Sequence, residues 1–454
     1  MKRIYTFFLL ASFQSLYSQV PYSFYGFYPI AQSHIFNPAA PVHERFTLGL
    51  INTGLQLHNT PFRPMELFLK DGNINQVLRN SISGMKQGDF LTMDVRTDLL
   101  FLGIKIKDLY FTAGAYNQMS LLFGYPVELF RLAYFGNAQY QNQTVNILGN
   151  SIESISYSAI HAGTQIQMKR LTIGSRVKLL NGIQSFKTEK TRAEIGFYDT
   201  AWTLSSDILI RSSGSFDNLD KDFINIQNHL VPGSTGNSGV AFDFAAAWDV
   251  SPKLRVSALM ADVGKIRWNR NLTEYYSSGT AEFKGLNINL ADDSQQDSFQ
   301  EVIDSINSAL NINKREGTSY STALPVRLSA IVDYKFYKNQ RLMAFADYRF
   351  TNDFAFFAFG AQYHIPLFTW FHLMGSYTVS NRNFYNFGAG FAIKLLGFQI
   401  FAITDQLNSI FNPEKLNSIN VRIGINYSLT NHSYYSSGLP SKKKKIKNKE
   451  LNTE

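Results

Sequence analysis

The chain contains no cysteine among its 454 residues. This absence excludes disulfides, thiolate metal sites and a lipid-modified cysteine anchor. Long hydrophobic runs are also missing, because no stretch after the N-terminal segment approaches the ~18 consecutive apolar residues that a transmembrane helix needs. A helical membrane protein is therefore excluded, although 45% of the residues are hydrophobic.

The sequence also has little that points to catalysis. Its eight histidines are scattered, and none stands at metal-ligand spacing from a second histidine or a carboxylate. It lacks a nucleophile elbow, a phosphate-binding loop and a dinucleotide-binding glycine pattern. We therefore expect a non-enzymatic protein with no catalytic residue, no cofactor and no metal. A hydrolase whose catalytic residues come from distant positions is the enzyme alternative.

Residues 1–18 predict a secretory signal peptide. Lys2 and Arg3 precede an apolar run that is too short to span a bilayer as a helix. The small residues Ser15 and Ser18 predict cleavage after Ser18, which leaves Gln19 as the mature N-terminus. We therefore expect the protein to be secreted through the inner membrane.

Apolar and polar side chains alternate with the period of a β-strand. In residues 326–337, Val326, Leu328 and Val332 alternate with Arg327 and Asp333, and residues 341–350 and 421–428 follow the same pattern. Aromatic residues make up 15% of the chain, as expected for lipid-facing girdles. These features predict an all-β, transmembrane antiparallel β-barrel in the bacterial outer membrane. A large soluble β-protein is the alternative.

About sixteen strand-like runs lie between residues 46 and 428. The pair near 191–212 reads as a hairpin outside the wall, which leaves about 14 strands, within a range of 12–16. Short turns such as Lys169-Arg170 are expected on the periplasmic side. Long loops near 59–90, 122–151, 214–237, 268–324 and 407–419 are expected outside the cell. Helical spacing at 65–85, 125–135 and 298–310 predicts that these loops are partly helical.

The net charge of +9 comes mostly from the two ends of the chain. Lys2 and Arg3 leave with the signal peptide, and residues 430–454 carry six lysines and two glutamates. The lysines are Lys442, Lys443, Lys444, Lys445, Lys447 and Lys449. The remaining body is only weakly basic, which argues against a nucleic-acid partner. We expect the tail to be a disordered periplasmic extension. Contact with anionic headgroups, wall polymer or an acidic partner is the alternative.

The alternation places a set of charged side chains on the lumen face. The expected lumen network consists of Asp94, Arg96, Asp98, Arg176, Lys178, Arg255, Arg327, Asp333, Arg341, Asp347, Arg349 and Arg422. The set contains positive and negative side chains, and arginine is the most frequent of them. These groups are therefore expected to pair across the interior rather than form a ring of one charge sign. This interpretation favours a structural network over a dedicated substrate-binding cluster.

The motif Asn37-Pro38-Ala39 stands just before the first strand. In this position it resembles the FadL-like transporter barrels and the PorV and PorP/SprF barrels of type IX secretion. Segments 174–182, 262–268, 320–325 and 405–424 together look like an outer-membrane barrel family of unknown function from gliding, type-IX-secreting bacteria. The resemblance covers about residues 19–429. It implies an N-terminal plug, here rich in aromatic residues, and it assigns no activity.

The sequence therefore divides into a signal peptide (1–18), a plug or lead-in segment (19–45), a barrel (46–429) and the basic tail (430–454). The main hypothesis is a scaffold or accessory subunit of an outer-membrane assembly for secretion, gliding or surface-protein biogenesis. The alternative is a FadL-like conduit for hydrophobic or small solutes. Expected partners are outer-membrane lipid, other outer-membrane or periplasmic proteins, and a hydrophobic ligand.

Overall fold

The computed structural model describes residues 22–63, 74–148, 152–198, 202–214, 231, 233–283, 310–337, 339–350, 355–380, 383–408 and 417–430. The expected signal peptide and the six tail lysines lie outside the described residues. Among the helices of these ranges, none has the length and apolarity to cross a bilayer.

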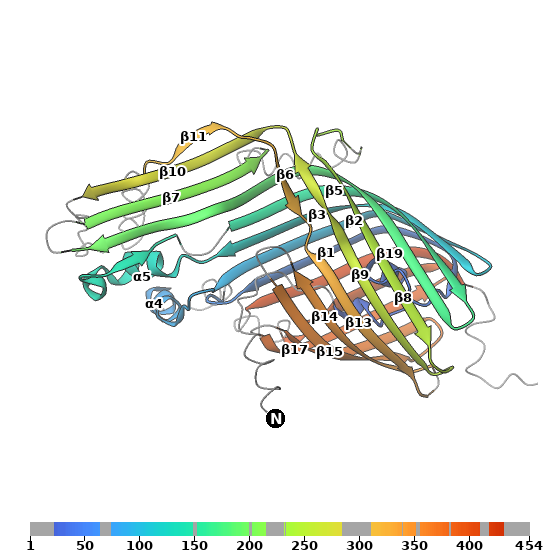
Figure 1. The fold of residues 1–454 in the computed structure, drawn as a ribbon. Coiled ribbons are helices and arrows are strands. Elements are labelled where there is room, and N and C mark those ends of the chain that lie inside the picture. Colours follow the sequence, from blue (N-terminus) through green and yellow to red (C-terminus); the bar gives the residue numbers. More distant parts are fainter. Residues whose placement is uncertain are drawn as a thin grey trace, which may run out of the picture.

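Fourteen strands form the wall of the barrel, and each pairs antiparallel with both of its neighbours (Figure 1). The wall strands are β1 (Glu44–Asn59), β2 (Phe90–Ile106), β3 (Leu109–Gly124), β5 (Ile152–Met168), β6 (Leu171–Phe197), β8 (Ser238–Asp249), β9 (Leu254–Trp268), β13 (Val326–Lys335), β14 (Arg341–Phe350), β15 (Ala355–Pro366), β16 (Phe371–Ser380), β17 (Asn383–Leu395), β18 (Phe398–Thr404) and β19 (Ser418–Thr430). The ring closes where β19 pairs with β1, from Glu44 opposite Thr430 to His58 opposite Ser418. The prediction of a closed antiparallel barrel of about 14 strands is confirmed.

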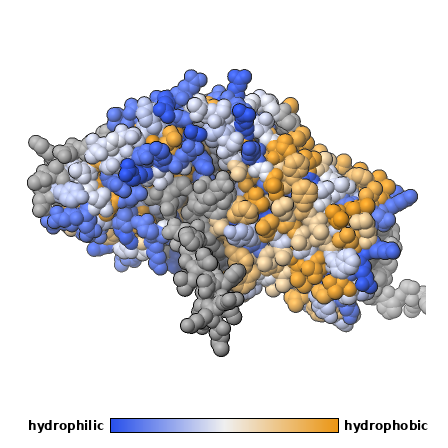
Figure 2. Space-filling model, viewed as in Figure 1, coloured by the Kyte–Doolittle hydropathy of each residue, from blue (hydrophilic) through white to orange (hydrophobic). Residues whose placement is uncertain are grey.

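The two faces of the wall differ as the pleat of a β-strand requires. On β13, Leu328, Val332 and Tyr334 are exposed, whereas Arg327 and Asp333 are buried toward the interior. Figure 2 shows apolar surface gathered over the barrel wall and hydrophilic surface over the other half of the molecule. An apolar exterior of this kind is what a bilayer requires of a barrel wall.

The sheet extends beyond one end of the wall (Figure 1). Strand β6 is 27 residues long, and its second half pairs with β7 (Trp202–Ser213) rather than with β8. Strand β7 pairs with β10 (Leu272–Phe283), which pairs with β11 (Asn313–Glu316). Two short strands join the edges: β4 (Thr144–Asn146) pairs with β6, and β12 (Tyr320–Ala323) pairs with β9.

The extension corrects two sequence expectations. The predicted pairing near 191–212 lies outside the wall, where β6 pairs with β7, but residues 191–197 continue wall strand β6 and are not a separate strand. The sequence predicts a loop over 268–324, but this segment contains β10, β11 and β12. Strand β10 was missed because Thr273–Tyr276 and the residues after them are largely polar, so its stability comes from pairing with β7 along its full length.

Short helices lie beside the extension. Helix α4 (Ile74–Gly84) and helix α5 (Val127–Phe135) fall within two of the three segments with helical spacing. The third, 298–310, lies outside the described residues except for Leu310. Met85, Tyr125 and Val127 pack together beneath the two helices.

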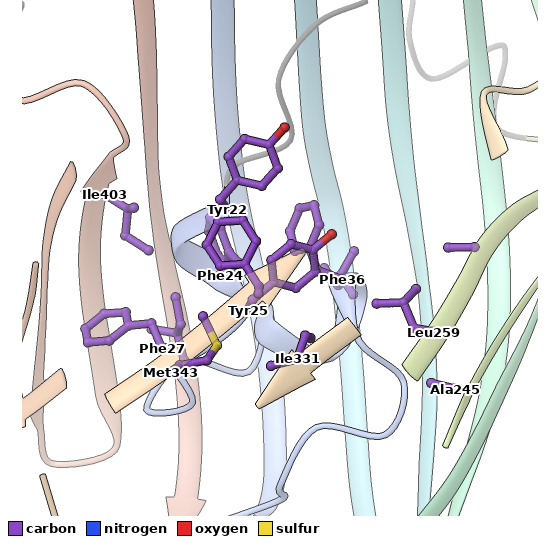
Figure 3. Close-up of a cluster of buried hydrophobic side chains, with 14 of the residues drawn as sticks. Tyr22, Phe24, Tyr25, Phe27, Phe36, Ala245, Leu259, Ile331, Met343 and Ile403 are labelled. Atoms are coloured by element: carbon purple, nitrogen blue, oxygen red, sulfur yellow. The ribbon is translucent and has the colours of Figure 1, made fainter. Parts of the chain in front are cut away.

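The interior of the barrel is occupied by residues 22–43, here called the lumen segment. Every residue from 22 to 40 is buried, and the segment contains the 3-10 helix η2 (Tyr22–Phe24) and helix α2 (Ser33–Phe36). Figure 3 shows its aromatic rings among wall side chains such as Ile331, Met343 and Ile403. Tyr22 stacks on Phe345 at 5.2 Å, and Phe24 meets Phe401 edge-on at 6.1 Å. Each such buried ring contributes about 1.5–3 kcal/mol.

Candidate functional site

Three arginines of the wall hold the backbone of the lumen segment. Arg176 on β6 donates to the carbonyl oxygens of His34 (2.5 Å) and Ile35 (2.8 Å). Arg327 on β13 donates to the carbonyl of Phe36 at 3.0 Å, and Arg255 on β9 donates to that of Ala39 at 2.9 Å. Hydrogen bonds from a charged donor are about twice as strong as neutral ones, so these contacts fix residues 34–39 against one side of the wall.

Neutral amides hold the segment against the other side. Gln362 on β15 donates to the carbonyl of Ser23 at 3.0 Å, and Gln399 on β18 donates to that of Pro29 at 2.8 Å. Asp405 follows β18 and accepts hydrogen bonds from the backbone N–H of Ser23, at 3.1 Å, and from its hydroxyl. Burial raises the pKa of Asp405 to about 6, and the hydrogen bonds from Ser23 oppose that rise.

The Asn37-Pro38-Ala39 motif forms a turn inside the lumen. Asn37 ends helix α2, where its N–H donates to the carbonyl of Ser33 at 2.9 Å. Its side-chain oxygen accepts from the N–H of Ala39 at 3.0 Å, as in an Asx turn. Pro38 lies directly on Gly174 of β6, so closely that a β-carbon at Gly174 would overlap the Pro38 carbonyl. The motif therefore anchors the end of the lumen segment to the wall.

The charged residues of the wall form ion pairs along its inner face, within one strand or between strands that are adjacent or one strand apart, rather than across the lumen. The Asp98 carboxylate forms ion pairs with Arg96, at 2.9 Å, and with Arg422, at 2.6 Å. Asp243 on β8 receives Arg176 at 3.2 Å and Lys178 at 2.6 Å, and Lys178 also reaches Asp262 at 2.5 Å. Nearer the short turns, Arg255 pairs with Asp249 at 2.9 Å, and Arg341 pairs with Asp333. Carboxylates are thus shared between cations, and only a few groups have a partner to themselves.

Two cavities lie on either side of the lumen segment. The loop-side cavity, of about 110 Å³, meets the segment at Ile35 and Phe36. The turn-side cavity, of about 400 Å³, meets it at Pro41 and Val42. The cations on the loop-side wall are Arg96, Lys178, Arg327, Arg349 and Arg422, against the carboxylates Asp94 and Asp262. On the turn side, Lys105, Arg170, Lys253, Arg255, Lys335 and Arg341 face Asp249 and Asp333.

All twelve residues of the expected lumen network are placed by these contacts. Six of them line the loop-side cavity: Asp94, Arg96, Lys178, Arg327, Arg349 and Arg422. Arg255, Asp333 and Arg341 line the turn-side cavity. Asp98 and Arg176 line neither cavity and pair with Arg422 and Asp243, and Asp347 accepts from the Tyr25 hydroxyl at 3.1 Å.

Sequence reasoning missed Asp262 and the amides. Asp262 adopts a left-handed backbone conformation (φ 61°), where β9 changes partner from β13 to β12. Such a break in the alternation turns its side chain toward Lys178, and an Asp two residues before a Gly within a strand is the signal that could have indicated it. Gln362 and Gln399 occupy inward positions of regular strands, so the same alternation could have found them.

No group of three or more His, Cys, Asp or Glu side chains in the described ranges could hold a metal ion. His364 and His372 lie side by side, with 3.1 Å between their ring nitrogens. A pair alone does not form a structural metal site, which usually needs four ligands.

A closed antiparallel barrel with an apolar exterior and a polar lumen is a transmembrane β-barrel of the outer-membrane type. The chain belongs to the family described as "Family of unknown function (DUF5723)", whose model matches residues 38–405. No curated protein has a sequence that matches this chain.

Several solved barrels are similar to this chain. The toluene transporter TbuX of Ralstonia pickettii is 10% identical with a TM-score of 0.40, covering 88% of this chain and 93% of its own. A Pseudomonas aeruginosa FadL homologue is 10% identical with a TM-score of 0.44, covering 92% and 99%. The translocator domain of the autotransporter NalP from Neisseria meningitidis is 7% identical with a TM-score of 0.34, covering 85% and 89%. Likeness at this level says nothing about what the present chain transports or binds.

Proposed function

We propose that this barrel is a conduit for small solutes across the outer membrane and that the lumen segment is its plug. The observation that carries the proposal is the position of the segment between two cavities of the same lumen. Ile35 and Phe36 border the loop-side cavity, and Pro41 and Val42 border the turn-side cavity. A solute that passes from one mouth to the other must displace this segment.

The way the plug is held supports a movable element. The wall closes through its own fourteen strands, so its ring of backbone hydrogen bonds does not include the plug. The plug is held by side chains such as Arg176, Gln362 and Gln399, and no plug residue belongs to a strand of the sheet. When the plug leaves, these polar side chains meet water that enters the lumen, which limits the cost of release. Its aromatic cluster favours the closed state at rest.

The direction of the barrel follows from the two kinds of connection. Single-chain outer-membrane barrels have short periplasmic turns and longer extracellular loops. We therefore place the turn-side cavity toward the periplasm and the extension of β7, β10 and β11 outside the cell. In this orientation the C-terminal end of the plug, at Pro41 and Val42, lies on the periplasmic side, where the chain continues into β1.

A disulfide between plug and wall tests the proposal. The hydroxyls of Ser23 in the plug and Ser376 on β16 are 3.3 Å apart, and the native chain has no cysteine to interfere. We expect the oxidised S23C/S376C variant, reconstituted in liposomes, to lose most of its permeability to small solutes and to recover it on reduction. The variant S206C/S277C is the matched control, because these hydroxyls are 2.6 Å apart within the extension. Equal permeability of oxidised and reduced S23C/S376C would refute the plug.

A second candidate function is that of an accessory subunit of an outer-membrane assembly. The extension favours it, because a polar sheet built beyond the wall adds surface that a conduit does not need (Figures 1 and 2). All four residues of edge strand β11 are exposed. The sequence resemblance to type IX secretion barrels also favours this second candidate function. Isolation from native membranes in mild detergent tests it, since a stoichiometric partner supports the subunit and a lone barrel argues against it.

A further inference from the structure

The loop-side cavity has a charge pattern that its own ion pairs do not balance. Five cations and two carboxylates line it. The carboxylates behind this lining are Asp98, Asp243 and Asp347, and a sixth cation, Arg176, stands with them. With these neighbours included, the part of the lumen that the structure describes has six cations and five carboxylates around this cavity. A lumen with low-dielectric walls focuses this residual positive potential into the cavity.

Arg327 is a lining cation with unused hydrogen-bonding capacity. Its side chain forms no ion pair within the described residues, and only 5% of the residue surface is exposed. One guanidinium N–H reaches the Phe36 carbonyl at 3.0 Å, and its Nε has no hydrogen-bond partner. The guanidinium carbon also lies 5.8 Å from the centre of the Tyr25 ring and 5.6 Å from that of Phe36. The carboxylates of Asp347 and Asp262 stabilise this charge without direct contact, so what the buried guanidinium lacks is a partner for its Nε–H.

The neighbouring cations are more fully paired. Lys178 contacts two carboxylates, and Arg96 and Arg422 share Asp98. An incoming anion therefore finds an unused N–H donor at Arg327. A guanidinium also suits a carboxylate through two parallel N–H groups, which an ammonium cannot offer.

The size and lining of the cavity restrict the anion. A volume of about 110 Å³ accommodates a small solute. Ile35, Phe36, Ile155 and Leu324 supply apolar lining beside the charges. An anion with a short apolar group fits both features.

We propose that the loop-side cavity binds small monocarboxylates through Arg327 and that such carboxylates are the solutes of this conduit. The transport half of this inference rests on the function proposed above, whereas the binding half does not. The turn-side cavity agrees with it, because six cations and two carboxylates line the lumen beyond the plug. A carboxylate then meets a favourable lining on both sides of the plug.

Binding to the purified full chain in detergent is the first test. The probes are butyrate and its neutral counterpart butyramide, measured by calorimetry. We expect butyrate to bind, butyramide to bind at least ten times more weakly, and added salt to weaken butyrate binding. Equal affinity for the two probes, or binding of neither, would overturn the inference.

Variants locate the site. We expect R327Q to lose at least tenfold in butyrate affinity and R327K to keep part of it. R315Q is the matched control, because Arg315 pairs with Glu274 in the extension, outside the wall. Unchanged affinity in a folded R327Q protein contradicts the assignment. If R327Q does not fold, the comparison of butyrate with butyramide on the native chain still tests whether the cavity binds carboxylates.

The same measurements separate the two proposals. Butyrate affinity is also measured on oxidised S23C/S376C, in which the plug is held in place, and we expect it to be retained. Binding without any disulfide-sensitive flux means that the conduit is wrong and the site is right. Disulfide-sensitive flux that is equal for butyrate and butyramide means that the conduit is right and the carboxylate inference is wrong.

Discussion

Pro38 of the plug lies against Gly174 of β6 with no room for a side chain between them. A β-carbon at position 174 would overlap the Pro38 carbonyl and approach the Pro38 Cβ to 2.9 Å. The plug and the wall are thus fitted to each other at the level of single atoms, at a position where only glycine permits the approach.

Replacement of this glycine should loosen the plug. We expect G174A to destabilise the docked plug by about 1–3 kcal/mol, because added volume in a filled site forces the backbone to move. The control is G375A on β16, where a new β-carbon meets no atom within 4 Å. Hydrogen exchange of residues 22–40 reports the change, and equal protection in G174A and G375A would contradict it.

Loss of Arg176 should cost more than loss of a surface cation. Arg176 holds two plug carbonyls and Asp243, and R176Q leaves these acceptors buried. Breaking a buried pair typically costs about 3–5 kcal/mol, and we expect the low end because Lys178 still contacts Asp243. K190Q, which breaks the exposed pair with Asp207, should cost less than ~1 kcal/mol. Urea unfolding in detergent compares the two, and equal midpoints would contradict the prediction.

Acid should weaken the docking of the plug through its histidines. Burial, and then the charge of Arg176, lower the pKa of His34 to about 3, and burial likewise lowers the pKa of His43. The histidines of a released plug regain ordinary pKa values near ~6.5. As the pH falls below that value, the released plug binds protons and the docked plug does not, so acid favours release. For each histidine whose pKa is lowered in the docked state, the free energy of docking becomes less favourable by ~1.4 kcal/mol per pH unit between the free and the docked pKa values.

Asp405 should oppose this effect. Its pKa of about 6 in the docked state lies above its ordinary value, so docking gains from this group as the pH falls from about 6 toward 4. We therefore expect H34Q to resist acid release and D405N to release more readily than the native chain between pH 7 and pH 5. Hydrogen exchange of residues 22–40, corrected for the intrinsic effect of pH on exchange, measures both. Parallel pH profiles for the three proteins would contradict the assignment.

A charge on the lipid face should obstruct insertion. Val332 on β13 and Ile312 beside the extension are similarly exposed, at 42% and 40%. We expect V332R to destabilise the inserted barrel by about 2–4 kcal/mol, as a cation near the bilayer midplane does. I312R should change it by less than ~1 kcal/mol, because position 312 meets water. Folding into lipid vesicles, followed on gels by the shift of the folded barrel, gives both values, and a similar loss in I312R would argue against this placement of the membrane.

The sequence by itself determined the wall and its two faces. Alternation at Leu328, Val332 and Asp333 depends on the pleat of a single strand, so neighbouring residues suffice to predict which side chains face lipid and which face the lumen. The closed ring of 14 strands followed from counting such segments. The same local rule failed at Asp262, where one left-handed residue shifts the alternation, and in β10, whose polar residues carry no apolar period.

Only the tertiary structure decided what the lumen does. Arg176 is 142 residues from His34, and Arg327 is 291 residues from Phe36, yet each arginine bonds the backbone of the plug. Nothing local to either residue indicates its acceptor, because backbone carbonyls are present at every position and leave no mark in the sequence. Closing the ring brings these distant segments together, and closure also buries Arg327 at a cavity, where it makes no ion pair with any residue that the structure describes.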